Sequence, residues 1–309
     1  MRLLITGASG FVGRALVRQI LAEDPVSELV LLDRTFVGIP ADPRIVGIEG
    51  DLLDPDIQAR AIGGGVDAMI HMATVPGGAA EADRALSRRI NVDASLDLFD
   101  LAASKGNRPR IVFTSTIAVL PAPPPPAIDD TTPLAPFLSY GAHKLMCEVY
   151  LADLHRRGEV SAVSVRLPGI LARPKGPSGM KSAFISEMFH AAVADEPFIC
   201  PTSKNGHIWA MSVDQVARNL RHALRLDDRM DLPASRAVTL PALRFSMGAL
   251  AEALDGQVEF VPDPVLESQF AAQPPLDTAA ANRAGFSHDG DLFTLVRRAL
   301  TEIRTTAPA

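Results

Sequence analysis

Hydrophobic residues in the first half of the chain form short runs rich in β-branched side chains, and longer amphipathic segments separate most of these runs. The runs occupy residues 2–6, 28–33, 44–51, 67–73, 110–115 and 160–168. Continuous apolar runs of this length are typical of strands buried on both faces. Helical periodicity covers residues 12–23, 91–106 and 140–158. This alternation predicts an α/β fold of Rossmann type, with a doubly wound parallel sheet.

The alternation weakens after about residue 168, where proline and glycine become frequent. We therefore predict a Rossmann domain over residues 1–167, to which residues 208–230 return. Residues 168–207 and 231–309 would form a smaller C-terminal substrate-binding lobe. The proline-rich segment 121–136 is expected to be a stiff surface loop near the carboxyl edge of the sheet, because strand and helix periodicity continue on both sides of it.

Composition narrows the classes of partner. The chain of 309 residues has a formal net charge of −6 and a pI near 5.7, without a basic run that would suit nucleic acid or an anionic membrane. We find no uninterrupted apolar segment of ~18 residues, the length of a membrane span. Cys147 and Cys200 lie outside any CxxC or Cys/His cluster, so we expect two free thiols, no metal site and a cytoplasmic location. Small soluble molecules are the expected partners.

A glycine-rich turn follows the first predicted strand. Gly7, Gly10 and Gly13 form a GxxGxxG pattern that opens a helix. Such glycines allow a tight turn, a close approach to a pyrophosphate and close helix packing, and the helix N-terminus favours negative charge. A lone glycine pattern is weak evidence, but its place between strand and helix predicts a dinucleotide-binding turn. We expect Ser9, Phe11 and Val12 to contact the dinucleotide as well.

Asp33 ends the second predicted strand, 20 residues after Gly13. A carboxylate at this place can accept hydrogen bonds from the adenosine ribose and would repel a 2′-phosphate, which favours NAD over NADP as the cofactor. Arg34 complicates this choice because a guanidinium can bind a phosphate. The alternative interpretation of Asp33 is an ordinary turn residue at a strand end.

Tyr140 and Lys144 lie four residues apart at the start of a predicted helix and would project from one face. A nearby ammonium favours the phenolate of a tyrosine, whose unperturbed pKa is about 10. Ser115 or Thr116, at the end of the strand that precedes this helix, would present a hydroxyl at the same sheet edge. YxxxK pairs are common by chance, so the interpretation as an acid-base pair depends on this combination of features.

The motifs TGASGFVG, GDLLD, HMAT, TST and YGAHK, in this order, resemble the extended short-chain dehydrogenase/reductase family over nearly the whole chain. The resemblance implies that Tyr140 is the general acid-base, that Lys144 lowers its pKa and holds the nicotinamide ribose, and that Thr116 orients the substrate. It also implies cofactor contacts from the adenine to the nicotinamide. These are assigned to Asp51, Leu52, Ala73, Thr74, Asn91, Ser115 and Pro168. We interpret His71, which has no partner motif, as a structural histidine.

The second half of the chain resembles the D-erythronate dehydrogenase group within that family, in segments 166–184, 207–220, 236–254 and 286–300. This resemblance implies NAD-dependent oxidation of the C2 hydroxyl of a small sugar acid. Candidate substrate residues are a set of cations and hydroxyls, in addition to Thr116 and Tyr140. They are Arg173, Lys175, His207, Ser182 and Thr74. The alternative is that these side chains provide only surface charge or hydrogen bonds within turns. For Lys175 and for His207 this alternative is as favoured as substrate binding.

Two other functions remain open from the sequence. A nucleotide-sugar epimerase or dehydratase would retain NAD and return the hydride, but only Trp209 and two tyrosines could form an aromatic platform for a base. A nucleotide-sensing regulator would not need to retain Thr116, Tyr140 and Lys144. The family resemblance also implies a homodimer formed through the helices over residues 91–106 and 140–158.

Overall fold

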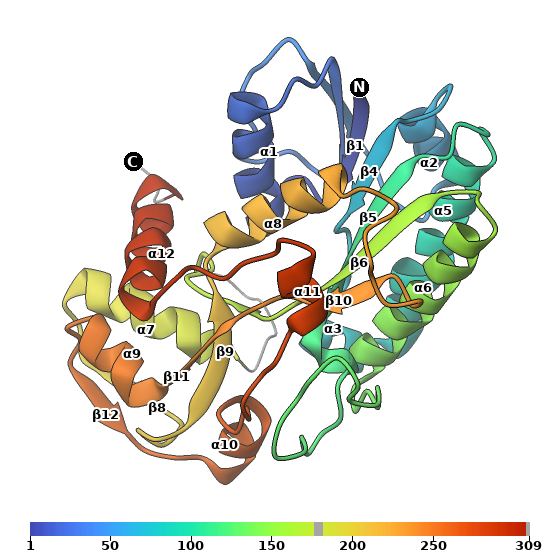
Figure 1. The fold of residues 1–309 in the computed structure, drawn as a ribbon. Helices are drawn as coiled ribbons and strands as arrows, with labels where there is room; N and C mark the ends of the chain where they lie inside the picture. Colours follow the sequence, from blue (N-terminus) through green and yellow to red (C-terminus); the bar gives the residue numbers. More distant parts are fainter. Residues whose placement is uncertain (176–181, 307–309) are drawn as a thin grey trace.

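The computed structural model describes residues 1–175 and 182–306 and is built on one large sheet (Figure 1). Its strands are β1 (Arg2–Thr6), β2 (Glu28–Asp33), β3 (Ile45–Glu49), β4 (Ala68–His71), β5 (Arg110–Thr116), β6 (Ser161–Leu167) and β10 (Ala237–Thr239). They lie in the order β10-β6-β5-β4-β1-β2-β3, and all neighbours are parallel. The six predicted strands are all present, and the Rossmann-type fold is confirmed.

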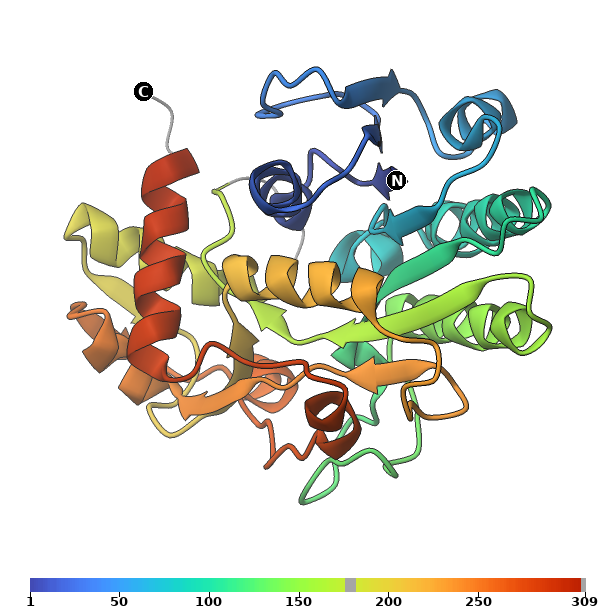
Figure 2. The same cartoon turned by 45° about the horizontal axis from the view of Figure 1, so that its top comes forward.

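Helices cover both faces of this sheet, as Figures 1 and 2 show. One layer contains α1 (Phe11–Glu23), α8 (Val213–Arg225) and α11 (Ala279–Arg283), and the other contains α2 (Pro55–Ile62), α5 (Ala94–Ala103) and α6 (Ser139–Arg156). Strand β1 shows why both layers are needed. Leu3 and Ile5 are buried under the first layer, whereas Leu4 is buried under the second. Because successive side chains of a strand point to opposite faces, a wholly apolar strand requires cover on both.

The helix expected over residues 91–106 has a different beginning. Short helices α3 (Gly77–Ala82) and α4 (Arg84–Arg88) lead into a π-helix, η1 (Arg89–Asp93), and α5 continues from it to Ala103. The polar side chain of Asn91 is bonded to the loop after β4, which lies outside the helix. A π turn of this kind, which is frequent at functional sites, is not visible in hydrophobic periodicity.

The C-terminal lobe has its own small sheets and its own core. The sheets are formed by β7 (Gly169–Ile170), β9 (His207–Met211) and β11 (Leu243–Ser246), and by β8 (Phe198–Cys200) with β12 (Val258–Phe260). The lobe's helices are α7 (Ala183–Ala194), α9 (Met247–Ala253), α10 (Pro264–Phe270) and α12 (Leu292–Thr306). Buried side chains of β8, β9, α7, α9 and α12 form one apolar cluster that is distinct from the two clusters beside the main sheet.

The division of the chain differs from the predicted one in two places. Strand β10 and helix α11 belong to the Rossmann layers, although residues 231–309 were assigned to the lobe. Strand β9 belongs to a lobe sheet, whereas α8, which follows it directly, packs on α1 as the predicted return of residues 208–230 requires. Only three residues of β10 pair with β6, which is too few for a periodic signal in the sequence.

The proline-rich loop after the 3₁₀ turn η2 (Ile117–Val119) is at the surface but is tied to the C-terminal part of the chain. Ile128 is buried, its N–H donates to Pro275 O (2.9 Å), and its carbonyl accepts from Asp277 N (2.8 Å). Asp130 accepts a hydrogen bond from Ala280 N (2.7 Å) at the start of α11. The loop therefore connects the carboxyl edge of the sheet to the segment that joins α10 to α11.

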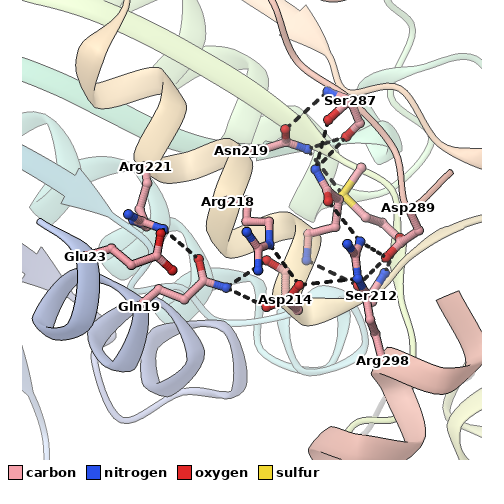
Figure 3. A network of polar contacts seen from close by, with 12 residues as sticks. Gln19, Glu23, Ser212, Asp214, Arg218, Asn219, Arg221, Ser287, Asp289 and Arg298 are labelled. Atoms are coloured by element: carbon pink, nitrogen blue, oxygen red, sulfur yellow. Dashed lines mark hydrogen bonds and ion pairs between the residues drawn. The ribbon is translucent and has the colours of Figure 1, made fainter. Parts of the chain in front are cut away.

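Helix α8 is fastened by polar side chains to α1 on one side and to the segment before α12 on the other (Figure 3). Gln19 of α1 donates to Asp214 Oδ1 (2.8 Å), and Asn219 of α8 donates to Ser287 O (2.9 Å). Since α8 follows directly from β9, these contacts fix the orientation of the lobe sheet relative to the Rossmann domain.

Asp289 is the most buried carboxylate of this network. It accepts from Ser212 N (2.9 Å) at the N-terminus of α8 and from Arg298 Nη1 (2.9 Å) of α12. We expect Asp289→Asn to lower the free energy of unfolding by about 2–3 kcal/mol, because Arg298 loses the shorter of its two ion pairs and an amide replaces a fully buried ionised acceptor. Urea unfolding measures this. Asp153→Asn, which removes the exposed ion pair with Arg156, should cost less than about 1 kcal/mol. Equal losses in the two variants would contradict a structural role for the Asp289 network.

Candidate active site

The glycine turn lies where the strand order reverses, between β1 and β4, which is the place where open parallel sheets bind ligands. Gly7 has a φ of +71°, and a Cβ on it would lie 2.9 Å from Ala73 N in the loop after β4. A Cβ on Gly13 would collide with the carbonyl oxygens of Gly7 and Ala8. Gly10 precedes α1 and provides no side-chain cap, so the first N–H groups of the helix are free of a side-chain acceptor at this position. The turn therefore has the space and the polarity for a pyrophosphate.

Asp33 braces the same turn from the end of β2. Its carboxylate accepts from Ser9 N (2.8 Å) and from Arg34 N (2.8 Å), while the Arg34 side chain is exposed. A carboxylate fixed beside the glycine turn can accept ribose hydroxyls, and it opposes a phosphate at the same place. This geometry supports the preference for NAD that the sequence suggested.

The positions expected to contact adenine are adjacent to Asp33. Gly50 N donates to Asp33 O (3.0 Å), which places the turn after β3 beside the end of β2. Asp51 is exposed and accepts from Leu53 N (2.9 Å), whereas Leu52 is buried. The predicted residues thus lie together at one edge, with one polar and one apolar side chain.

Asn91 fixes the loop that follows β4. Its Oδ1 accepts from Val75 N (2.7 Å) and from Thr74 Oγ1 (3.0 Å), and its Nδ2 donates to Val75 O (2.9 Å). The same Nδ2 reaches Ser87 Oγ (3.2 Å), which also contacts His143 Nδ1 (3.0 Å) in α6. Asn91 therefore holds the Thr74 loop in place and connects it to the helix that carries Tyr140, as a residue behind the nucleotide would.

His71 is fully buried at the end of β4 and bonds on both sides of its ring. Nδ1 lies 2.7 Å from Thr6 Oγ1, and Nε2 lies 2.9 Å from Ser95 Oγ. Thr6 Oγ1 in turn accepts from Ala73 N (3.2 Å). Burial and the nearby charge of Lys144 lower the pKa of His71 to about 3, so the ring is neutral at physiological pH. These contacts agree with the interpretation of His71 as structural.

The two hydroxyls at the end of β5 point to different places. Thr116 is half-buried, and its Oγ1 accepts from Ala118 N (3.1 Å) in η2. Ser115 is buried, and its hydroxyl donates to Glu148 in α6. Thr116 is therefore the hydroxyl available at the sheet edge, and a contact of Ser115 with the cofactor would come from its backbone.

Tyr140 meets Thr116 at the start of α6. Burial raises the pKa of Tyr140 to about 12, while the charge of Arg173 and a hydrogen bond with the Thr116 side chain oppose this rise. Tyr140 is thus a protonated phenol at neutral pH in this structure. Its neighbours act in the direction that a general base needs.

Lys144 is buried one turn further along the helix. Its Nζ lies 4.6 Å from the centre of the Phe113 ring and 5.9 Å from the centre of the Tyr140 ring. Burial lowers the pKa of Lys144 to about 8. The sequence predicted that Lys144 would lower the pKa of Tyr140. This role stays a prediction, and the structure adds a second cation, Arg173 from the other half of the chain, whose charge opposes the rise in that pKa.

Gly141 allows the start of α6 to approach η2. A Cβ at this position would collide with the carbonyl of Ala118 and would lie 3.0 Å from Pro136 Cβ. On the outer side, Ser139 N donates to Glu81 Oε1 (2.6 Å). The second position of the YGAHK motif therefore brings Tyr140 close to the strand end with Thr116.

Arg173 comes from the segment after β7, and its guanidinium lies 6.0 Å from the centre of the Phe11 ring, at the start of α1. Its position is fixed by its backbone. Arg173 N donates to Ser186 Oγ (3.2 Å), and Arg173 O lies 2.7 Å from His190 Nε2. Ser186 and His190 could not be predicted from the sequence, since no motif surrounds them and only the packing of α7 brings them to Arg173.

The other predicted substrate residues are placed less directly. Ser182 is half-buried before α7, and Lys175 is exposed. His207 begins β9, where its N–H donates to Ala271 O (2.7 Å), while the opposite end of β9 pairs with β7. Pro168 is buried between β6 and β7. Residues 176–181 of the segment 166–184 lie outside the described residues.

Two classes of feature are absent from residues 1–175 and 182–306. No helix there combines the length and apolar character needed to cross a membrane. Nor do three or more histidine, cysteine or acidic side chains gather there in a way that could hold a metal ion.

Comparison with known proteins gives matches over most of the chain. Residues 3–233 match the profile of the NAD dependent epimerase/dehydratase family. The chain is 35% identical to D-erythronate dehydrogenase of Cupriavidus necator over 82% of this chain and 81% of that protein. It is 28% identical to D-erythronate dehydrogenase of Haemophilus influenzae, over 96% and 98%. The solved structure of a nucleoside-diphosphate-sugar epimerase from Agrobacterium tumefaciens matches with a TM-score of 0.91 at 27% identity, over 99% of this chain and 95% of that one.

Proposed function

The chain belongs to the NAD dependent epimerase/dehydratase family, and from this premise we propose that it oxidises the C2 hydroxyl of a four-carbon sugar acid, D-erythronate or a related aldonate. The enzyme is an NAD-dependent oxidoreductase, and the product would be the 2-oxo acid. Two D-erythronate dehydrogenases similar over most of their length support this substrate. The observation that carries the proposal is the meeting of Tyr140 with the Thr116 hydroxyl and the Arg173 charge.

The residues at the sheet edge fit NAD. We propose that the turn from Gly7 to Gly13 holds the pyrophosphate, that Asp33 accepts the adenosine ribose, and that Asp51 and Leu52 contact adenine. The loop with Ala73 and Thr74 would lie under the pyrophosphate and ribose, and the nicotinamide half would meet Ser115, Lys144 and Pro168. When bound, NAD supplies the hydride acceptor for the oxidation.

The chain's own residues would handle the proton. The C2–H bond breaks with loss of a hydride, and the O–H proton of the same carbon passes to the Tyr140 phenolate, so that a carbonyl forms. Thr116 would hold the reacting oxygen by a hydrogen bond as its charge changes. Burial of Tyr140 raises its pKa, so the phenolate depends on the positive charge around it.

Arg173 is the proposed partner of the substrate carboxylate, since its planar guanidinium can bind a carboxylate with two hydrogen bonds. We expect Arg173→Met to lower kcat/KM for the sugar acid about 100-fold, mainly through KM, because a buried ion pair of roughly 2–3 kcal/mol is lost. Steady-state kinetics measure this, and NADH titration should show unchanged cofactor affinity.

Lys175, two residues further along, provides the matched control. Its side chain is exposed, so we expect Lys175→Met to change kcat/KM by less than about threefold. If Lys175→Met lost as much activity as Arg173→Met, the proposed pairing of Arg173 with the substrate carboxylate would be wrong.

The substrate is tested by assaying four- to six-carbon aldonates with NAD and with NADP. We expect NADH formation to be fastest with a four-carbon acid and to be weak with NADP, because Asp33 opposes the 2′-phosphate. A protein that oxidises none of these acids would refute the proposed substrate.

A nucleotide-sugar epimerase is the second candidate, and the match to a nucleoside-diphosphate-sugar epimerase structure favours it. Such an enzyme would purify with NAD bound and convert a UDP-sugar without net NADH. A non-catalytic nucleotide sensor is disfavoured because Thr116, Tyr140 and Arg173 are assembled at one place.

We also propose that the protein is cytoplasmic and that it forms a homodimer through the outer faces of α5 and α6. Val149 is 65% exposed and Met146 is 48% exposed on α6, whereas Leu98 of α5 is fully buried in the core and unavailable to a partner. Cys147 and Cys200 are buried free thiols, which suits a reducing compartment. Light scattering of the purified protein tests the dimer.

A further inference from the structure

Glu148 is a buried carboxylate in α6, four residues after Lys144, and its side chain is 2% exposed. Its Oε1 accepts from the Ser115 hydroxyl, and both its oxygens accept from Arg166, with 2.7 Å between Oε2 and Nη2. Ser115 of β5 and Arg166 of β6 are paired neighbours in the sheet. One carboxylate therefore joins two strands to the helix of the proposed active site.

The place of this carboxylate relates it to the proposed chemistry. Ser115 directly precedes Thr116, and Glu148 lies one turn after Lys144, so the contact fixes α6 against the strand end that carries Thr116. None of the motifs recognised in the sequence includes Glu148, and Arg166 is only the first residue of the segment 166–184. If Glu148 and Arg166 had only a structural role, an apolar pair of similar volume would serve, because such a pair is often as stable as a buried ion pair.

The charges around Lys144 show what else Glu148 does. Burial lowers the pKa of Lys144, and Cys147 and Glu148 act in the opposite direction. Burial raises the pKa of the Cys147 thiol to about 12, so the thiol is neutral at physiological pH. On the other sides of Lys144, the ring of His71 and the phenol of Tyr140 are also neutral there. Among these neighbours the carboxylate of Glu148 supplies the negative charge, which it shares with its ion-pair partner Arg166.

We propose that Glu148 is a positioning residue that keeps the buried Lys144 protonated and holds α6 in register with the Thr116 strand end. Lys144 would then meet the cofactor ribose as an ammonium group with all three donors. This inference rests on the proposed role of Lys144 at the cofactor. Glu148 would balance the charge of Lys144 from a position outside the active site itself.

NADH fluorescence titration from pH 6 to pH 10 tests the proposal without any sugar acid, so an error in the proposed substrate leaves the measurement intact. We expect wild-type affinity to fall about fivefold as Lys144 loses its proton, since a charged donor binds more strongly than a neutral one. Glu148→Gln keeps the shape and removes the charge. The midpoint of that fall should move about one pH unit lower, because less negative charge favours the neutral amine.

The matched control is Asp24→Asn, which removes another buried carboxylate, one that pairs with Arg221 (2.6 Å) and Arg225 at the end of α1. It should lower the Tm and leave the midpoint unchanged. Should Glu148→Gln not fold, the double variant Glu148→Gln, Arg166→Met avoids an unpaired arginine, and its midpoint should still lie below that of the wild type. A Glu148 variant with a wild-type midpoint and only a lower Tm would overturn the proposal, as would affinity in the wild type that is flat across this pH range.

Discussion

Replacing Tyr140 by phenylalanine is expected to lower kcat for NADH formation by about 10³-fold and to leave NADH affinity within a factor of about two. The variant retains the ring and the helix but loses the oxygen that would take the C2 hydroxyl proton. That oxygen is held by Thr116 and lies in the field of Arg173. Stopped-flow or steady-state assays with the preferred sugar acid measure the rate, and fluorescence titration measures binding.

The chain has one other tyrosine, and it gives a matched control. Tyr150 lies on the outer side of α6, where its hydroxyl donates to Asp100 Oδ1 (2.6 Å). Tyr150→Phe should retain nearly full activity. If Tyr140→Phe turned over sugar acid at the wild-type rate, Tyr140 would have no part in the mechanism. If both variants lost activity alike, the loss would reflect damage to α6.

Gly13→Ala is expected to weaken NADH binding about 100-fold and to lower the free energy of unfolding by about 1–3 kcal/mol. The new Cβ would collide with the carbonyl oxygens of Gly7 and Ala8, which are backbone atoms of the turn and cannot move aside as a side chain can. Helix α1 must then shift away from β1 and distort the turn. Titration with NADH and thermal unfolding measure the two effects.

Gly64 offers the control for this substitution. It lies between α2 and β4, and a Cβ there would meet no atom within 4 Å. Gly64→Ala should leave cofactor affinity unchanged. Wild-type affinity in Gly13→Ala would show that the glycine turn does not bind the dinucleotide.

Several features of the site could be predicted from the sequence because they depend on local patterns. The GxxGxxG turn needs only a strand before it and a helix after it, and Asp33 needs only to end the next strand. Strand ends of a parallel sheet lie at one edge, so Thr116 and the start of the helix with Tyr140 were expected to be close. The structure places these residues at that edge.

Other features depended on contacts between distant segments. The sequence offered Ser115 and Thr116 as similar hydroxyls, and only the burial of Glu148 behind β5 separates their roles. The assignment of Lys144 as the cation that lowers the pKa of Tyr140 followed from helical spacing. In the folded chain Arg173 also acts in that direction, because the segment after β7 brings it to α1 and α6.

The sequence by itself determined the fold class, the glycine turn and the order of the motifs, since hydrophobic periodicity and turn chemistry act over a few residues. The tertiary structure alone decided which hydroxyl meets Tyr140, that Arg173 acts on the same phenol, and that β10 completes the main sheet. The physical reason is the range of the interactions. Secondary structure follows from neighbours along the chain, whereas the direction of a buried side chain and the charge that it meets are set by packing between elements more than 30 residues apart.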